Sequence, residues 1–358
     1  MSMKIALTTP YYPPHIGGIE VHVKTLAEKL KGKGYEVEVI SSTGRDGEIH
    51  LRRIPSIPIP YSPIPIFFPD VEADVYHSHI PAPFFARRIK NKPHIITYHN
   101  EVVIPEKVGG IRIPRFFADR IEKMNEKLVT PVLDRAEIII ATTKSYAESS
   151  PMLRDYMNKV EIVPNGVDPE RFNSGSDAGK RGAIVLYVGR LVEYKGLHIL
   201  IKAMSAVQDV VESVLVVIGD GEDRKTFEFL AKQLAVNIEF KGRVADDEVV
   251  AWMKKARVLV LPSQSMEAFG IVLLEAMACK TPVIASKLPG VMEVAREGGL
   301  IFEDETDLAE KLIELLTNET LTTSLGLKGR CAVEEKYSWD VIVRDRIEKI
   351  YDAVRVRG

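Results

Sequence analysis

The feature that most constrains the fold is an alternation of short apolar runs with longer amphipathic stretches. In the first half of the chain, Ile19–Lys31 places Val21, Leu26, Ala27 and Leu30 at helical spacing. The β-prone runs of that half are Lys4–Thr9, Val37–Ile40, Val75–His77, His94–Tyr98 and Ile138–Ala141. Strands that alternate with helices predict a parallel sheet with helices on both faces, the doubly wound α/β class.

A stretch rich in serine, glycine and asparagine interrupts this alternation at 171–182 and has the composition of a linker. The alternation then restarts, with β-prone runs at Ile184–Val188, Val214–Ile218, Ile238–Lys241, Val258–Leu261 and Pro282–Ala285. A length of 358 residues also favours two domains, at roughly 150 residues each. We therefore expect two α/β units, 1–168 and 169–340, and a C-terminal helix in 341–358 that packs across their junction.

Composition removes several classes of function. With 48 Lys and Arg against 50 Asp and Glu, the net charge of −2 indicates no overall field for nucleic acid or an acidic membrane. Two cysteines, Cys279 and Cys331, are too few for a disulfide framework or a four-thiolate zinc site. No apolar run approaches the ~18 residues of a transmembrane helix, and the N-terminal run is too short for a signal peptide. These features predict a cytoplasmic protein, and the scarcity of glutamine is typical of a thermophile.

Two segments combine apolar residues with proline or arginine. Ile54–Pro69 contains six prolines, so it cannot form a helix or a central strand. Gly109–Arg120 mixes three arginines with isoleucine and phenylalanine. Together, 54–69 and 109–120 could form a basic, apolar rim for peripheral contact with the inner membrane face or a lipid-linked acceptor. A packed helix with a solvated basic face explains the second segment as well.

In the second half, polar residues follow the ends of successive strands, which converge on one edge of a parallel sheet. Arg190 lies just past one strand, and Lys195 follows near a helix start. Two cations beside free backbone N–H groups suit a diphosphate, although an ordinary loop with surface charges fits equally. Gly219–Arg224 lacks the third glycine of a dinucleotide fingerprint and by itself indicates a tight turn. Lys241–Val244 ends a strand with a glycine, where a flat ring could lie.

Glu267 and Glu275 are the most informative pair. Glu267 precedes the helical stretch Gly270–Ala278, and Glu275 lies inside it, roughly 9–12 Å from the loop. That helix is otherwise almost wholly apolar, and a buried carboxylate rarely lacks a partner. One carboxylate could reach a sugar while the other accepts hydrogen bonds from a ribose diol. An ion pair with a core Arg or Lys is the structural alternative for Glu275.

Histidines occur near two strand ends of the first half. His77 and His79 lie two residues apart on one strand and therefore face the same side. A metal site there would need a third ligand that the sequence does not supply, so structural or acceptor-pocket roles are preferred. His99 directly follows the strand His94–Tyr98.

With these motifs the sequence resembles the retaining glycosyltransferases of family 4. That resemblance implies the GT-B fold, in which two Rossmann-like doubly wound domains face each other across a deep cleft and a C-terminal helix crosses back. The segments that carry it span nearly the whole chain: Gly17–Glu20, Asp74–His79, Val163–Asp168, Gly189–Gly196 and the Glu267–Glu275 pair. One segment departs from the family pattern, because Leu288–Val294 has a single glycine and carries Met292 where the family has proline.

The resemblance also implies roles for individual residues toward a nucleotide-diphosphate-sugar donor held mainly by the second domain. Arg190 and Lys195 neutralise the diphosphate, Glu275 bonds the ribose hydroxyls, and Glu267 faces the donor sugar as a positioning residue. His99 contacts the transferred sugar. The remaining donor-binding residues are Gly17, Gly18, Gly219, Arg243, Val244 and the backbone amides of Ala268, Phe269, Gly270 and Ile271.

The expected activity is metal-independent transfer of a hexose, with retention, from a nucleotide-diphosphate sugar to an acceptor hydroxyl. UDP is the first choice of nucleotide and GDP the second, the acceptor is a sugar, glycolipid or small polyol, and no cofactor is needed. An enzyme resembling UDP-N-acetylglucosamine 2-epimerase and a non-catalytic nucleotide-sugar-binding protein are the alternatives. The two glutamates beside Arg190 and Lys195 favour the transferase.

Overall fold

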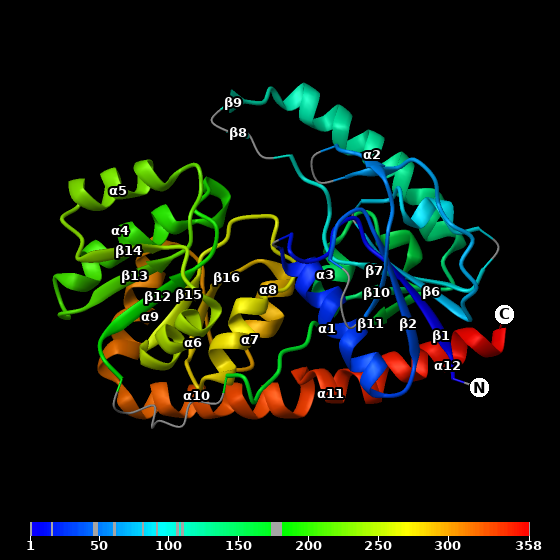
Figure 1. Ribbon diagram of the computed structural model, residues 1–358. Coiled ribbons are helices and arrows are strands. Elements are labelled where there is room, and N and C mark those ends of the chain that lie inside the picture. Colours follow the sequence, from blue (N-terminus) through cyan, green and yellow to red (C-terminus); the bar gives the residue numbers. More distant parts are fainter. Residues whose placement is uncertain are drawn as a thin grey trace. The chain divides into compact units, whose positions relative to one another are not determined.

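The computed structural model describes residues 2–15, 17–45, 49–59, 62–80, 82–90, 92–104, 107–108, 111–172 and 181–357. The chain forms two compact units (Figure 1). Unit 1 contains Met1–Glu106, Arg112–Gly166 and Trp339–Gly358, and unit 2 contains Lys107–Ile111 and Val167–Ser338. Most of the predicted linker lies outside the described residues, because 173–180 are not among them.

Unit 1 is built on a seven-stranded sheet in which every neighbouring pair is parallel. Its spatial order is β11-β10-β7-β6-β1-β2-β3. The strands are β1 (Lys4–Thr8), β2 (Glu36–Ser41), β3 (His50–Arg53), β6 (Val75–Ile80), β7 (His94–Tyr98), β10 (Ile138–Ala141) and β11 (Val160–Ile162). The chain therefore runs outward from β1 in one direction, returns, and runs outward in the other, which is the Rossmann pattern.

Helices flank the sheet of unit 1, and one small strand pair accompanies it. The helices are α1 (Gly18–Gly32), α2 (Arg115–Arg135), α3 (Lys144–Ser149), α11 (Trp339–Ile342) and α12 (Glu348–Arg357). This small pair is β4 (Ser56–Ile57) with β5 (Ile64–Pro65), which is antiparallel. A further pair, β8 (Lys107–Val108) with β9 (Ile111–Arg112), lies mostly in the segment that belongs to unit 2. The described residues of the proline-rich segment, 54–59 and 62–69, thus form neither a helix nor a central strand, as expected.

Unit 2 repeats the same plan with six parallel strands in the order β14-β13-β12-β15-β16-β17. The strands are β12 (Ile184–Val188), β13 (Val214–Ile218), β14 (Ile238–Gly242), β15 (Val258–Leu261), β16 (Val283–Ser286) and β17 (Gly299–Phe302). The helices are α4 (Leu197–Gln208), α5 (Arg224–Gln233), α6 (Asp246–Lys255), α7 (Ile271–Ala278), α8 (Pro289–Ala295), α9 (Glu305–Thr317) and α10 (Glu319–Ala332).

Each sheet is buried on both faces, which explains why its central strands are uniformly apolar. Along β12, Leu186 packs into one cluster with α7, while Val185 and Tyr187 pack into another with α4. Successive strand residues point to opposite faces, so one short apolar run serves two cores. The final helices belong to unit 1, where Tyr351 is fully buried in the same cluster as Leu7.

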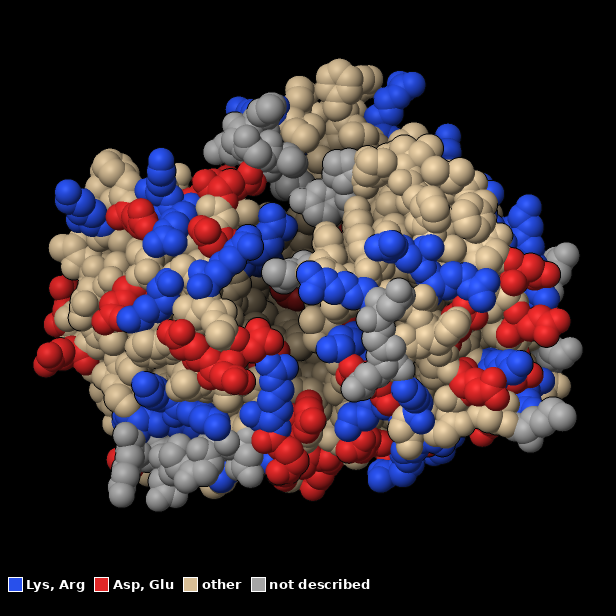
Figure 2. All heavy atoms as spheres, in the orientation of Figure 1, with Lys and Arg blue, Asp and Glu red and all other residues tan. Residues whose placement is uncertain are grey.

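Charged residues of both signs are interspersed over the face of the molecule that Figure 2 shows. This distribution agrees with the near-zero net charge of the sequence. Among the described residues, no helix has both the length and the apolar character that a membrane span requires.

Candidate active site

The candidate site of unit 2 lies where the direction of the chain through the sheet reverses. β12 pairs with β13 on one side and with β15 on the other, so the connections that leave β12 and β15 diverge. In open parallel sheets, ligands bind at the carboxyl ends of the strands beside such a point. The loops that start there contain Gly189–Gly196 and 262–270, two of the segments that the sequence singled out.

Two glycines bring the backbones of neighbouring loops into contact at this edge. Gly196 has φ of 74°, and a Cβ there would lie 1.9 Å from the carbonyl oxygen of Pro262. The amide of Gln264 donates to the carbonyl of Tyr194 at 2.8 Å and ties the same two loops. Only glycine combines this left-handed conformation with so close an approach.

Gly219 likewise allows the backbones of the loops after β12 and β13 to come into contact. Its φ is 129°, and a Cβ would lie 1.9 Å from the carbonyl oxygen of Gly189. The amide of Leu191 donates to the carbonyl of Asp220 at 3.1 Å. This contact gives Gly219 a structural reason to be glycine, and its predicted contact with the donor stays a prediction.

Lys195 and Glu267 form an ion pair across the two central loops. Lys195 Nζ lies 2.6 Å from Glu267 Oε2, and the side chains are 18% and 20% exposed. The other carboxylate oxygen of Glu267 accepts from the amide of Gly270 at 3.1 Å. The sequence assigned Lys195 to the diphosphate and Glu267 to the sugar separately, whereas the structure makes them one charged unit at the start of α7.

Arg190 and Arg243 are exposed cations at the same edge of the sheet. Within the described ranges, neither guanidinium has a hydrogen bond or an ion pair, and Arg190 accepts only through its carbonyl, from the Tyr187 hydroxyl at 2.9 Å. Val244, next to Arg243, packs against the core. Both arginines are thus free to meet an anion that arrives from solution.

Glu275 occupies the middle of α7 and is partly buried. Burial is the main cause that raises the pKa of Glu275 to about 7. The charge of Arg171 lowers this pKa, and the charge of Asp246 raises it further. Arg171 forms an ion pair with Asp246, in which Nη2 lies 3.0 Å from Oδ2. In the part of the chain that the structure describes, the Glu275 carboxyl has no hydrogen-bond or ion-pair partner, so the core ion pair that was the structural alternative is not formed. An unpartnered carboxyl with a raised pKa is a characteristic of binding sites.

The start of α7 supplies backbone amides. Gly270 has φ of 80° and precedes the first residue, Ile271. The side chains of Ala268 and Phe269 are buried, so only their backbone can face a ligand. Of these four predicted amides, that of Gly270 already donates to Glu267. Leu288–Val294, the segment whose sequence differs from the family pattern, forms most of α8, which begins at Pro289.

In unit 1, Gly17 and Gly18 open α1 after the loop that follows β1. Gly17 is extended, with φ of −177°, and a Cβ would lie 2.1 Å from Glu20 Oε2. Glu20 Oε1 in turn lies 2.7 Å from Nδ1 of His15. The absence of a side chain at Gly17 therefore makes room for the buried Glu20 carboxylate.

His99 lies in a histidine cluster at the carboxyl ends of β6 and β7. Its Nε2 is 3.0 Å from Nδ1 of His79, and the ring of His22 on α1 is 4.9 Å away, edge to face. Burial holds the pKa values of His79 and His99 well below the ordinary value and lowers that of His22 to about 4. These imidazoles are therefore neutral at pH 7. His77 bonds Thr97 and Tyr351 instead.

His22 joins His79 and His99 in a group that does not include His77. One nitrogen from each of His22, His79 and His99 lies within 4.8 Å of the others, and among the described residues this is the group that could hold a metal ion. Neutral imidazole is the form that binds transition metals. The expected independence from metal remains a prediction.

Three features of the site were missed from the sequence. They are the position of Arg171 near Glu275, the Lys195–Glu267 ion pair and the contact of His22 with His99. Arg171 lies in the segment interpreted as linker, and His22 lies in an ordinary helical pattern. Each joins residues that are far apart in the chain, so no local signal could have identified it.

Comparison with known proteins agrees with this geometry. Residues 169–331 match the family model for glycosyl transferases group 1, and residues 16–171 match that for glycosyltransferase family 4. An uncharacterized glycosyltransferase of Methanocaldococcus jannaschii is 31% identical over 98% of this chain and 98% of its own. The phosphatidyl-myo-inositol mannosyltransferase of Mycobacterium leprae is 30% identical, over 99% of this chain and 98% of its own.

Solved structures share the fold at lower identity. Sucrose-phosphate synthase from Thermosynechococcus elongatus superposes with a TM-score of 0.79 at 21% identity, over 99% of this chain and all of that one. Anabaena HepE in complex with UDP-glucose gives 0.73 at 19%, over 98% of this chain and all of its own. The two Rossmann-like halves are those of a GT-B glycosyltransferase, an enzyme class that acts on a nucleotide-sugar donor. The chain belongs to glycosyltransferase family 4.

Proposed function

We propose that this glycosyltransferase moves a hexose, with retention and without a metal, from a nucleotide-diphosphate sugar to the hydroxyl of a sugar, a glycolipid or a small polyol. The observation that carries the proposal is the charge pattern at the β12/β15 edge. Arg190 is a free cation, Lys195 is held by Glu267, and the Glu275 carboxyl has no partner in the described chain. A diphosphate and a ribose diol complement these groups.

The chemistry follows from where negative charge develops. When the bond between the sugar and the diphosphate breaks, the leaving diphosphate gains charge, and fixed cations lower the barrier by stabilising it. Arg190 and Lys195 supply those cations. Glu267 holds the Lys195 ammonium and the amide of Gly270 in place, so it is a positioning residue and needs no covalent bond to the sugar. The family resemblance adds Gly17, Gly18 and His99 of unit 1.

The proposed nucleotide of the donor rests on family frequency and on the relatives. UDP remains the first choice and GDP the second. One relative, a GDP-mannose-dependent mannosyltransferase of Corynebacterium glutamicum, is 32% identical over 51% of this chain. HepE is seen with UDP-glucose. A cytoplasmic location and peripheral membrane contact through 54–69 and 109–120 also remain predictions, and exposed Ile66, Phe67, Phe116 and Phe117 favour the contact.

A thermal-shift screen tests the donor first, because a ligand that binds only the folded protein raises its melting temperature. UDP, GDP, ADP and their sugars are compared for the wild type and for Arg190→Ala, with Lys232→Ala as an exposed control cation of unit 2. We expect one nucleotide to raise Tm in the wild type and in the control but not in Arg190→Ala. Equal increases in Tm in all three proteins would show that Arg190 does not bind the diphosphate.

Transfer itself is then measured with that donor and a panel of sugars, polyols and glycolipids, with and without EDTA. The anomeric configuration of the product is read by NMR, and we expect retention and unchanged rates in EDTA. Release of an epimerised free sugar without acceptor would instead indicate the epimerase reaction. Tight nucleotide binding without any turnover would indicate a binding protein.

A further inference from the structure

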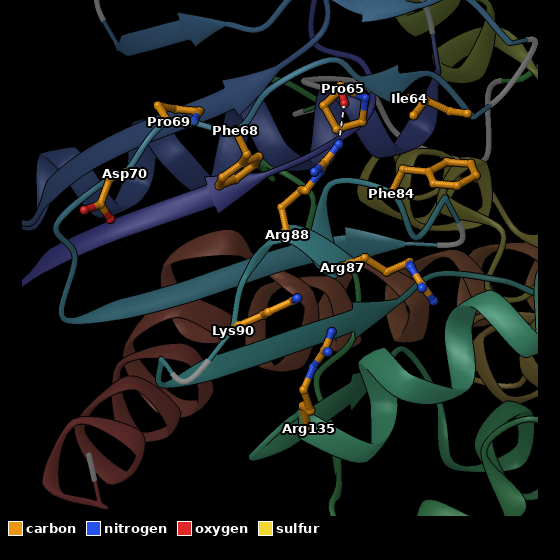
Figure 3. A pocket seen from close by; sticks show the side chains of 10 residues that line it. All are labelled: Ile64, Pro65, Phe68, Pro69, Asp70, Phe84, Arg87, Arg88, Lys90 and Arg135. Atoms are coloured by element: carbon orange, nitrogen blue, oxygen red, sulfur yellow. Dashed lines mark hydrogen bonds between the residues drawn. The ribbon is translucent and has the colours of Figure 1, made fainter.

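A basic pocket in unit 1 lies outside the donor site. The cavity measures about 680 Å³, and four cations line it: Arg87, Arg88, Lys90 and Arg135 (Figure 3). Lys90 precedes β7 and Arg135 precedes β10, so both come from segments that lead into the amino ends of their strands. His99 and its neighbours lie at the carboxyl ends of β6 and β7, so the pocket is not part of the histidine cluster.

The positive charge of this pocket is not compensated by the described residues. Nη1 of Arg87 donates to the Leu128 carbonyl and Nη2 of Arg88 to the Pro65 carbonyl, each at 2.9 Å, and both acceptors are neutral. In the chain that the structure describes, Lys90 and Arg135 have neither a hydrogen bond nor an ion pair through their side chains. Asp70 is the single carboxylate that lines the pocket, and no described ion pair joins it to the cations.

Structural roles explain some of these residues one at a time. Arg135 ends α2, where a cation is favourable for the helix dipole. Arg88 anchors the β4–β5 pair through Pro65. These roles do not explain the presence of Lys90. They also do not explain why the four cations line one cavity. Figure 3 shows the heads of Lys90 and Arg135 directed into the same space, while the Arg88 guanidinium points toward the Pro65 carbonyl.

Part of the pocket lining is apolar. Phe68, Pro69 and Phe84 line it, and the neighbouring Ile66 and Phe67 are 63% and 52% exposed. A cavity of this size has room for a small anionic group together with a substituent. Arginine pairs with phosphate oxygens through parallel N–H donors, and lysine adds a point charge.

We propose that this pocket binds the phosphate group of a phosphate-bearing ligand. The inference does not depend on the transfer reaction and concerns a second site. Two sources share the chemistry: the phosphodiester of an anionic lipid, beside which Ile66 and Phe67 would enter the membrane surface, and a free phosphate or diphosphate in solution.

The test uses the full chain with Lys90→Gln and Arg135→Gln combined. Both side chains are exposed and have no described partner, so their replacement should leave the fold intact. The matched control combines Lys92→Gln and Arg154→Gln, two exposed cations of unit 1 that lie outside the pocket and change the net charge equally. Circular dichroism and Tm check that both variants fold alike.

Two probes separate the sources. Inorganic pyrophosphate is titrated by calorimetry, and vesicles of phosphatidylglycerol with phosphatidylcholine are compared with phosphatidylcholine alone by flotation. We expect at least tenfold weaker binding of one or both probes by the pocket variant and little change in the control. Loss of vesicle binding indicates the lipid phosphate, and loss of pyrophosphate binding alone indicates a soluble phosphate.

Pyrophosphate also suits the donor site, so its titration is repeated with Arg190→Ala. Binding that survives Arg190→Ala and is lost in the pocket variant supports the second site, whatever the fate of the transferase proposal. Binding lost only in Arg190→Ala overturns it. Wild-type protein that binds neither probe, or equal binding by the pocket and control variants, overturns it as well.

Discussion

The β12/β15 edge of unit 2 and the β6/β7 edge of unit 1 have opposite electrostatic character. The first lies where the direction of the chain reverses in a six-stranded parallel sheet, and the second lies one strand away from the corresponding β1/β6 point of a seven-stranded parallel sheet. The first presents the Lys195–Glu267 ion pair together with Arg190, whereas the second presents imidazoles that burial keeps neutral. The comparison shows that the fold fixes where a site forms, and that burial of the side chains decides what the site can bind.

The first prediction concerns acid stability, and its expected effect is the largest. Burial lowers the pKa of five histidines, His22, His77, His79, His94 and His99. Below about pH 6.5 the unfolded chain takes up protons that folded unit 1 does not, so the stability of unit 1 falls as pH falls. Each histidine contributes up to about 1.4 kcal/mol per pH unit. Together they predict a loss of several kcal/mol between pH 6.5 and 5.5.

The two tryptophans make this measurable, because Trp252 lies in unit 2 and Trp339 in unit 1. Urea unfolding of Trp252→Phe, followed by fluorescence, reports on unit 1, and Trp339→Phe reports on unit 2. We expect only the unit 1 transition to move to lower urea at pH 5.5. An unchanged unit 1 midpoint would show that the histidines can protonate in place.

The second prediction removes the free cation of unit 2. Arg190→Ala should lower kcat/KM by about a hundred- to a thousandfold, the range seen when one preorganised electrostatic donor is lost. Steady-state kinetics with the donor from the thermal-shift screen measures it, and Lys232→Ala is the control. A variant with wild-type kcat/KM would show that charge at this edge does not stabilise the leaving group.

The third prediction concerns the Lys195–Glu267 ion pair. Lys195→Ala and Glu267→Gln should each lower activity, and the double variant should be less impaired than the sum of the two. The reason is that removal of either partner already disrupts the unit that they form at 2.6 Å. A coupling of about 0.5–3 kcal/mol in a double-mutant cycle is expected for residues in contact. Additive effects would mean that the two side chains act independently.

The fourth prediction, with the smallest effect, uses the pKa of Glu275, which burial raises to about 7. The ionised carboxylate accepts hydrogen bonds from a diol better than the protonated form, so donor affinity should rise as pH increases from 6 to 8. Glu275→Gln should remove this dependence and weaken binding about tenfold at pH 8. Calorimetry with a nucleotide sugar avoids the terminal phosphate of a nucleoside diphosphate, which itself titrates near pH 6.

The same group predicts a stability change opposite in sign to that of the histidines. The folded pKa of Glu275 lies above the ordinary value of 4.5, so folded unit 2 holds a proton that the unfolded chain releases between pH 4.5 and 7. Its contribution to stability therefore grows as pH falls through 7. The free energies of unfolding of wild type and Glu275→Gln should therefore differ more at pH 8 than at pH 5. A pH-independent difference would mean that Glu275 titrates normally.

Much of the fold could be predicted from the sequence because central strands buried on both faces read as continuous apolar runs. β3, β11 and β17 were missed, and all three are edge strands with partly exposed residues. At an edge only part of each strand is covered, so the apolar signal weakens. Of the candidate site, strand-end position predicted Arg190, Lys195 and Glu267, and a carboxylate inside an otherwise apolar helix predicted Glu275.

The sequence by itself determined the repeated α/β plan, the strand ends that carry polar residues and the family motifs, because these depend on local periodicity and on short, ordered segments. Only the tertiary structure decided which of those residues meet. It paired Lys195 with Glu267, left Glu275 without a partner, placed His22 against His99, and brought four cations to one cavity in unit 1. Charge state depends on burial and on neighbours from distant segments, and neither is encoded in the local pattern.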